Sequence, residues 1–415
     1  MLRIPRILQI SNHYLHPGGE EESVERIARK VGALAELERC CFDSRQWTGA
    51  GAPSVAKQAQ WMLHNPHSID RIQAIDERFQ PDVWLVHNVF PVGSAEIYNL
   101  AQRLKRPVIQ YLHNYRPLSI SGYSWAGGHV TRGSAARTYL REIWEGSWQN
   151  SRIKSAWFSM ILWRMRASSG YRSISAWIAI SDFVRSRFIQ AGFPSDRVHA
   201  LRHSWELRNG RVPPFEDKGY YLFLGRLVDQ KGISVLLRAW SELERRLGSA
   251  APQLKICGQG PLEAAVRAAC ERHTSLTFCG HTSGKEKDRI LRGCRAMIAP
   301  SLWWEPLGLV TYEAYDYGKP MLAARSGGLT ETVSHGRTGL LHQPGDWREL
   351  ANQVMALESN RALRREMGAA GRRWLVSHTG SEAWSVAFNR ILQQVTQADP
   401  ASPEPSIRPE PLTVG

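Results

Sequence analysis

The chain has 415 residues, 43% of them hydrophobic, which is more than one core usually holds, so two domains of ordinary size are expected. Lysine and arginine exceed aspartate and glutamate by 53 − 38 = 15, a balance that favours phosphates, acidic lipids or nucleic acid as partners. No charge-free apolar run of about 18 residues, no secretion signal and no CxxC or zinc-like spacing occurs, so we expect a cytoplasmic protein without a membrane-spanning helix, disulfide framework or metal site.

The first half of the chain alternates short apolar runs rich in β-branched residues with longer helical patterns. This rhythm is typical of strand-helix units in a parallel sheet. A loop at residues 12–19 precedes an amphipathic helix at 21–34. We therefore predict an α/β domain over residues 1–207. Its predicted strands are residues 6–10, 83–86, 108–112 and 177–180.

Residues 208–218 carry Pro213-Pro214 between charged residues, which predicts a linker. The same rhythm then restarts, and we predict a second α/β domain over residues 219–375, so that two doubly wound, Rossmann-like domains face a central cleft. A last helix at 376–396 is expected to pack back on the first domain, and the Pro-rich tail 397–415 is expected to be disordered. The second set of predicted strands is residues 220–224, 254–257, 276–279, 296–299 and 320–323.

The strongest chemical signal lies at residues 300–320, PSLWWEPLGLVTYEAYDYGKP. The pattern predicts a strand end, a tight loop with Pro306 and Gly308, and a helix that starts near Leu309. Glu305 is predicted in the loop, where open α/β sheets bind ligands, and Glu313 one turn into the helix. Free backbone N–H groups between them suit a diphosphate, and a carboxylate nearby can accept hydrogen bonds from ribose hydroxyls.

Two further segments point to the same edge of the second sheet. GRLVDQKG, residues 225–232, supplies Arg226 and Lys231, a fork-shaped and a point charge that both suit phosphate oxygens without a metal. ARSGGLTE, residues 324–331, ends another strand with Gly327 and Gly328, which let backbone amides approach a ligand closely.

In the first half, Gly18 and Gly19 lie in the first strand-to-helix turn, and His113 and Asn114 end a later strand. Both turns are expected to face the cleft. The Gly-Gly turn can hold phosphate or sugar oxygens, although glycine pairs also mark ordinary turns. His113 is placed to hydrogen-bond a sugar hydroxyl or polarise an acceptor, unless it is a structural histidine.

Over residues 6–395 the sequence resembles the family 4 glycosyltransferases of the GT-B fold, retaining enzymes that use nucleotide sugars. The resemblance rests on Glu305 and Glu313, on the GR…KG element at Arg226 and Lys231, on the GQGP turn at 258–261 and on the GGLTE segment. HNYRP and AISDFVRSRFIQAGF narrow it to bacterial members that build surface polysaccharides.

The resemblance implies that Arg226 and Lys231 hold the diphosphate, Glu313 the ribose and Glu305 the donor sugar, with His113 on the acceptor side. It implies a UDP- or GDP-sugar donor, a glycan or lipid-linked acceptor, no cofactor and no metal. The remaining residues expected to bind substrate are Gly18, Gly19, Asn114, Gly258, Gly260, His281, Pro306, Leu307, Gly308, Leu309 and Val310.

Residues 141–166 place Trp157, Ile161 and Met165 at four-residue spacing beside Lys154 and Arg164. A basic, Trp-bearing helix can lie in the headgroup layer of an acidic membrane, which would make the protein peripheral at the inner face. The same pattern also fits a helix packed against a sheet.

Other functions remain open. One is a catalytically inactive protein of the same fold that binds a nucleotide sugar or has a regulatory role. Two others are a phosphorylase and a sugar-nucleotide epimerase. A nucleic-acid partner is not expected, because no zinc-finger spacing, RNP-like run or basic tail accompanies the charge.

Overall fold

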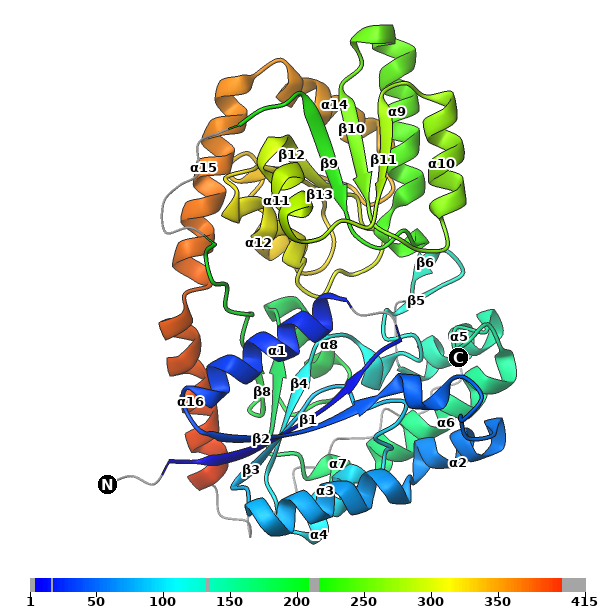
Figure 1. Ribbon diagram of the computed structural model, residues 1–415, viewed down its shortest axis with the longest axis vertical. Coiled ribbons are helices and arrows are strands. Elements are labelled where there is room, and N and C mark those ends of the chain that lie inside the picture. Colours follow the sequence, from blue (N-terminus) through cyan, green and yellow to red (C-terminus); the bar gives the residue numbers. More distant parts are fainter. Residues whose placement is uncertain (1–3, 16–17, 132–134, 209–215, 398–415) are drawn as a thin grey trace. The chain divides into compact units, whose positions relative to one another are not determined.

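A computed structural model describes residues 4–15, 18–131, 135–208 and 216–397 (Figure 1). Within these ranges the chain divides into two compact units. The first comprises residues up to 127, 131–204 and 381 onward, and the second comprises 128–130 and 205–380. Most of the predicted linker (209–215) and nearly all of the predicted tail (398–415) lie outside the described residues.

The first unit is built on a six-stranded parallel sheet in the order β2-β1-β3-β4-β7-β8. Its central strands β3 and β4 are buried on both faces, as parallel sheets covered by helices are. The strands are β1 (Arg6–His13), β2 (Glu36–Asp43), β3 (Val83–Val86), β4 (Val108–Leu112), β7 (Ala176–Ala179) and β8 (Val198–Ala200).

Helices on either side of this sheet bury its two faces (Figure 1). The last helix, α16, packs against α1, and Lys30 Nζ donates a hydrogen bond to Ser381 Oγ at 2.5 Å. The helices are α1 (Gly19–Gly32), α2 (Val55–Leu63), α3 (Pro66–Phe79), α4 (Ile97–Arg103), α5 (Ala135–Glu145), α6 (Arg152–Ala167), α7 (Ser169–Arg172), α8 (Asp182–Gln190) and α16 (Ser381–Gln397).

The second unit repeats the architecture with a parallel sheet in the order β11-β10-β9-β12-β13-β14. Its strands are β9 (Tyr220–Leu224), β10 (Gln253–Cys257), β11 (Leu276–Gly280), β12 (Cys294–Ala299), β13 (Met321–Ala324) and β14 (Gly339–His342). Its helices are α9 (Ile233–Leu247), α10 (Glu263–Arg272), α11 (Gly284–Gly293), α12 (Leu309–Asp316), α13 (Leu329–Thr332), α14 (Trp347–Glu358) and α15 (Arg361–His378). Two parallel α/β units confirm the predicted fold class.

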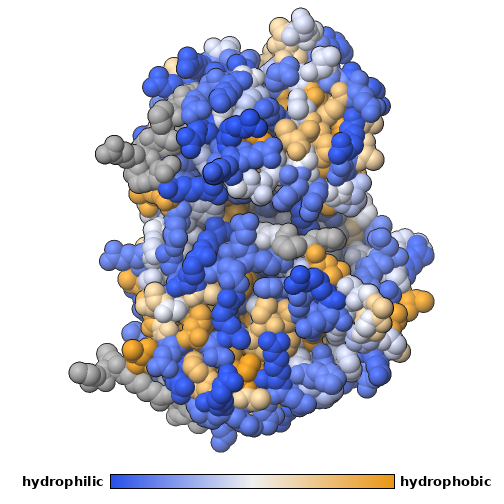
Figure 2. Space-filling view, viewed as in Figure 1, coloured by the Kyte–Doolittle hydropathy of each residue, from blue (hydrophilic) through white to orange (hydrophobic). Residues whose placement is uncertain are grey.

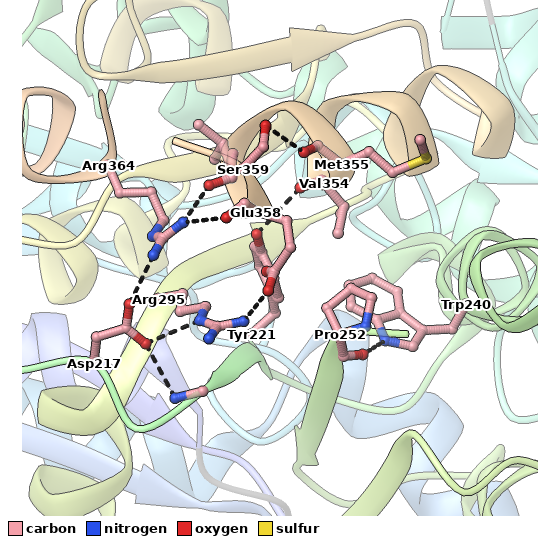
Figure 3. A network of polar contacts seen from close by, with 12 residues as sticks. Asp217, Tyr221, Trp240, Pro252, Arg295, Val354, Met355, Glu358, Ser359 and Arg364 are labelled. Atoms are coloured by element: carbon pink, nitrogen blue, oxygen red, sulfur yellow. Dashed lines mark hydrogen bonds and ion pairs between the residues drawn. The ribbon is translucent and has the colours of Figure 1, made fainter. Parts of the chain in front are cut away.

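An ion-pair network in the second unit joins its sheet to its helices (Figure 3). Asp217, just before β9, pairs with Arg295 on β12 at 2.9 Å and with Arg364 on α15 at 2.8 Å. Arg295 also pairs with Glu358 at the end of α14. Burial alone would raise the pKa of Asp217, but hydrogen bonds from Arg295, Gly219 and Arg364 outweigh it and lower the pKa.

The segment 141–166 forms parts of two helices, α5 and α6, instead of one. Gly146, Gln149 and Asn150 all have positive φ and end the helical path between them. In α6, Ile161 and Met165 are buried. This part of the segment therefore fits the interpretation of a helix packed against the rest of its unit.

Candidate active site

Glu305 is the centre of the candidate site in the second unit. It follows β12, and the residue is only 7% exposed. Its carboxylate accepts hydrogen bonds from Lys231 Nζ at 2.6 Å, Ser301 Oγ at 2.9 Å and Trp303 Nε1 at 2.8 Å. Lys231 ends a short 3₁₀ turn (Asp229–Lys231) after β9, the strand next to β12. Two neighbouring strand ends thus hold a fixed ion pair.

The loop after Glu305 leads directly into α12. Its N-cap is Gly308, with φ +83°, a conformation that an L side chain rarely adopts. A Cβ there would also lie 2.5 Å from Leu329 Cδ2. The first amides of α12, at Leu309 and Val310, have no acceptor within their own helix, as at every helix start. The loop thus directs polar N–H groups and the positive end of α12 to the same side as Glu305.

Gly327 and Gly328 hold the Pro306-Leu307 loop in place. The amide of Gly328 donates to the carbonyl of Glu305 at 2.7 Å. A Cβ at Gly328 would lie 2.6 Å from the carbonyl oxygen of Pro306. These two glycines therefore let two backbone segments touch.

The GQGP turn has a similar packing role. A Cβ at Gly258 would lie 1.8 Å from the carbonyl oxygen of Gly225, and one at Gly260 would lie 2.5 Å from that of Leu227. The turn after β10 thus supports the turn that carries Arg226 and Lys231.

The second carboxylate of the pair lies on α12. Glu313 forms an ion pair with Lys287 of α11, with Oε1 and Nζ 2.5 Å apart. Arg226 and His281 are exposed at the ends of β9 and β11. The structure therefore places all predicted donor residues in one unit, at or beyond the carboxyl ends of its strands.

The predicted residues of the first unit also follow strand ends. His113, 8% exposed, comes directly after β4 and forms a 2.8 Å hydrogen bond with His87 Nδ1 through its Nε2. Its Nδ1 is buried and has no partner among the described residues. Burial lowers the pKa of His113 to about 3, so the ring is neutral at physiological pH.

Asn114 contacts a carboxylate from the glycine-rich turn. Its Nδ2 donates to Glu20 Oε2 at 3.0 Å, and Tyr14 donates its hydroxyl to Glu20 Oε1 at 3.1 Å. Burial raises the pKa of Glu20 to about 7, although Arg116 partly opposes the shift. The amide of Gly18 donates to Glu21 Oε2 at 2.7 Å, so this amide is already used within the turn, whereas Gly19 is exposed.

Sequence reasoning missed several residues that contact the predicted ones. His87 carries a detectable signal, because it follows the predicted strand 83–86 as His113 follows 108–112. Glu20 adjoins the predicted glycine pair. Trp303 lies only two residues before Glu305 in the segment 300–320. Lys287 carries no such signal, because only the fold brings it to Glu313.

Within the part of the chain that the structure describes, no helix has the length and hydrophobicity needed to cross a membrane. The same residues contain no group of three or more His, Cys, Asp or Glu side chains arranged to hold a metal ion.

A family model of known glycosyltransferases matches each of the two units. The family model "Glycosyltransferase Family 4" matches residues 27–204, and "Glycosyl transferases group 1" matches residues 208–374. A GDP-mannose-dependent α-(1-6)-phosphatidylinositol monomannoside mannosyltransferase of Mycobacterium tuberculosis is 32% identical over 219 residues, 48% of this chain and 56% of the relative. A glycogen synthase of the same species is 31% identical over 183 residues, 43% of this chain and 42% of the relative. The chain thus spans about half the length of the curated relatives it matches.

Solved structures match over almost the whole chain. Anabaena HepE in complex with UDP has a TM-score of 0.66 at 17% identity, covering 94% of this chain and 99% of that one. Sucrose-phosphate synthase from Thermosynechococcus elongatus has a TM-score of 0.67 at 18% identity, covering 96% and 100%. At such identities the likeness establishes the fold. Since the two family models match the two halves of the chain in order, the chain belongs to glycosyltransferase family 4, the group 1 glycosyltransferases of the GT-B fold.

Proposed function

We propose that the protein is a retaining glycosyltransferase that moves a hexose-type sugar from a UDP- or GDP-sugar to a glycan or lipid-linked acceptor in bacterial surface polysaccharide synthesis. The observation that carries the proposal is the fixed Lys231–Glu305 pair beside the N-terminus of α12, with Glu313 further along the same helix. Cation, helix terminus and two carboxylates together suit a nucleotide diphosphate linked to a sugar.

Each group has a role that follows from its chemistry. Lys231, Arg226 and the first amides of α12 neutralise the diphosphate. Glu313 accepts hydrogen bonds from ribose hydroxyls. Glu305, held by three donors, accepts hydrogen bonds from hydroxyls of the donor sugar.

In the proposed transfer, the bond between the sugar's C1 and the diphosphate oxygen breaks while the acceptor oxygen bonds to C1 on the same face. The acceptor proton passes to the departing phosphate, and the products are a glycoside and a nucleoside diphosphate. Preorganised cations and backbone dipoles stabilise the departing charge, so no metal is required. His113, in the first unit, serves the acceptor side of the reaction.

The names of similar proteins support either nucleotide. The mycobacterial relative is named for GDP-mannose, whereas HepE is described in complex with UDP-glucose. Both donors therefore belong in the test.

A lipid-linked acceptor is supported by an exposed apolar surface on α5 and α6, here called the α5–α6 surface. Leu140 and Trp144 lie four residues apart on α5, and Ile153 and Trp163 lie on α6, all more than 60% exposed. Figure 2 shows orange apolar residues beside blue polar ones at the right-hand edge, where Figure 1 draws α5. Exposed aromatic side chains of this size suit the interface of a bilayer.

Cations surround these apolar groups. Arg152 lies with its guanidinium 4.3 Å from the centroid of the Trp144 ring, and three more exposed arginines stand on the same two helices. They are Arg137, Arg141 and Arg164. The charge suits acidic headgroups and supports a location at the inner face of the membrane.

Sedimentation with vesicles tests this part of the proposal. We expect the protein to sediment with phosphatidylglycerol vesicles but not with phosphatidylcholine vesicles, and Trp144→Ala combined with Trp163→Ala to weaken binding about tenfold. Val386→Ala, which removes an exposed apolar group of α16, is the matched control. Equal binding to both vesicle types, or no effect of the tryptophan changes, would contradict the membrane surface.

A donor screen tests the transferase itself. Purified protein is incubated with UDP- and GDP-sugars, EDTA and bacterial lipid extract, and released nucleoside diphosphate and glycosylated product are measured. We expect one donor to be used, and Glu305→Ala and Lys231→Ala to abolish its use. Binding of a nucleotide sugar without any turnover would favour the alternative, a catalytically inactive nucleotide-sugar-binding or regulatory protein of the same fold.

A further inference from the structure

Three adjacent strands of the first unit each contribute one residue to a buried chain of hydrogen bonds. Gln9 lies on β1, His87 directly follows β3, and His113 directly follows β4. Gln9 and His87 are each 1% exposed. Gln9 Nε2 lies 2.9 Å from His87 Nε2, and His87 Nδ1 lies 2.8 Å from His113 Nε2.

The donor-to-acceptor direction of this hydrogen-bond chain follows from its first member, Gln9. Gln9 Nε2 also lies 3.4 Å from the carbonyl oxygen of Val24. A carbonyl oxygen can only accept a hydrogen bond, so the atom of Gln9 that faces it is the amide nitrogen. The same nitrogen faces His87 Nε2, which therefore accepts.

The proton positions on the rings of His87 and His113 are then determined. A neutral imidazole has one donor and one acceptor nitrogen. Since Nε2 of His87 accepts, its Nδ1 carries the proton and donates to His113. Nε2 of His113 accepts in turn, and the proton of His113 resides on Nδ1. Burial lowers the pKa of both rings, in agreement with two neutral imidazoles.

We propose that Gln9 and His87 are positioning residues that fix His113 in the tautomer with its proton on Nδ1, so that it presents a hydrogen-bond donor to the substrate. His113 Nδ1 is buried without a partner among the described residues. A buried donor without a partner is unfavourable, and an incoming sugar or acceptor oxygen would relieve that cost. This inference rests on the proposed function only for the identity of the substrate.

The surroundings hold the rings in this arrangement. The planes of His87 and His113 make 27°, which suits an edge-to-edge N–H···N bond, and Tyr111 and His203 pack beside His113 with ring centroids 4.9 and 5.5 Å away. His87 is also fixed through its backbone: its N–H donates to the carbonyl of Ile10 at 2.9 Å.

Gln9→Glu should reverse the donor-to-acceptor direction of the hydrogen-bond chain. A carboxylate at position 9 accepts from His87 Nε2, so His87 Nδ1 becomes an acceptor, and His113 must move its proton to Nε2. Gln110→Glu is the matched control, since it adds the same carboxylate on β4, two strands away from β1, while Gln110 contacts the carbonyl of His87 and not its ring.

The test is the NMR spectrum of the full-length protein with isotope-labelled histidine, with the His113 signal assigned by loss in His113→Gln. The ring carbon and nitrogen shifts distinguish the two tautomers without any substrate. We expect the proton on Nδ1 in the wild type and in Gln110→Glu, and on Nε2 in Gln9→Glu. A wild-type proton on Nε2, or an unchanged tautomer in Gln9→Glu, overturns the proposal. If Gln9→Glu does not fold, the wild-type spectrum still decides.

Kinetics separate this inference from the proposed function. Loss of one preorganised donor costs about 10²–10³-fold in rate, so we expect kcat of Gln9→Glu to fall at least tenfold, while the KM for the donor, bound by the other unit, stays within twofold. An enzyme that shows no transfer at all refutes the proposed function but leaves the tautomer measurement valid. An altered tautomer with wild-type kcat refutes the positioning role.

Discussion

Replacing Glu305 with glutamine isolates the charge at the centre of the second unit. The carboxylate accepts three hydrogen bonds, from Lys231, Ser301 and Trp303. Glutamine has one acceptor oxygen and one donor nitrogen, so its NH₂ group must face either the ammonium of Lys231 or the two neutral donors. At least one charge-assisted bond is lost in either orientation.

The size of the effect follows from that lost bond. A hydrogen bond to a charged group contributes about 1.5–3 kcal/mol, and the Lys231 side chain, 21% exposed, can turn partly towards water. We therefore expect Glu305→Gln to destabilise the second unit by about 2 kcal/mol. For a unit of this size the midpoint of thermal unfolding would fall by about 4–8 °C.

The expected loss of activity is larger than the loss of stability. If Glu305 binds the donor sugar during transfer, its removal should lower kcat by about 10²-fold, the scale of one preorganised electrostatic contact. The assays are thermal unfolding with and without nucleotide, and steady-state transfer below the lowered midpoint.

Glu244→Gln is the matched control. This half-buried carboxylate also accepts several hydrogen bonds, including one at 2.6 Å from His273 Nδ1, but it belongs to α9 and lies away from the candidate site. It should lower the midpoint while leaving kcat unchanged. Wild-type kcat in Glu305→Gln, or equal loss of activity in both variants, would contradict a role of Glu305 in transfer.

Three further outcomes are expected. Burial raises the pKa of Glu20 to about 7, so the stability that protonated Glu20 contributes is complete below about pH 4.5 and is lost as the pH rises through 7. In urea unfolding, Glu20→Gln should therefore be more stable than the wild type at pH 8 but not at pH 5. Asp217→Ala removes the ion-pair partner of buried Arg364, which keeps only its hydrogen bonds to backbone carbonyls. It should cost about 3–5 kcal/mol of unfolding free energy without changing the KM for the donor; a smaller loss would mean that water replaces the carboxylate. Gly258→Ala places a Cβ 1.8 Å from a backbone oxygen and should destabilise the protein by at least about 2 kcal/mol. The control Gly336→Ala, with open space around it, should cost about 1 kcal/mol. Equal unfolding midpoints of the two variants would contradict the packing role of Gly258.

The fold class could be predicted because the central strands are short, apolar and bounded by turns. Residues 83–86, 108–112 and 220–224 were predicted with the bounds that the structure shows. The edge strand β2 was missed, since its sequence ELERCCFD carries charges on its exposed positions, as edge strands often do.

Residues of the candidate site, too, were partly predicted from the sequence and partly missed. Glu305 and Glu313 were predicted because both belong to one contiguous segment with a recognisable strand-loop-helix pattern. Lys287 was missed, because a contact across two elements leaves no spacing in the sequence. His87 was missed although it directly follows a predicted strand, as His113 does. The roles of Gly258 and Gly328 in packing also required the fold, since a glycine in a turn looks alike whether it faces a ligand or another backbone.

Calorimetric titration of the full-length protein with UDP and with GDP, in the presence of EDTA, directly tests whether the second unit binds a nucleoside diphosphate. We expect one of them to bind the wild type and Lys231→Met to weaken this binding by about 10–100-fold, the value of one charge-assisted hydrogen bond. Lys57→Met, on the surface of α2, should leave the binding unchanged. Binding of neither nucleotide, or equal affinity in Lys231→Met and the wild type, would contradict a nucleotide-diphosphate site at the start of α12.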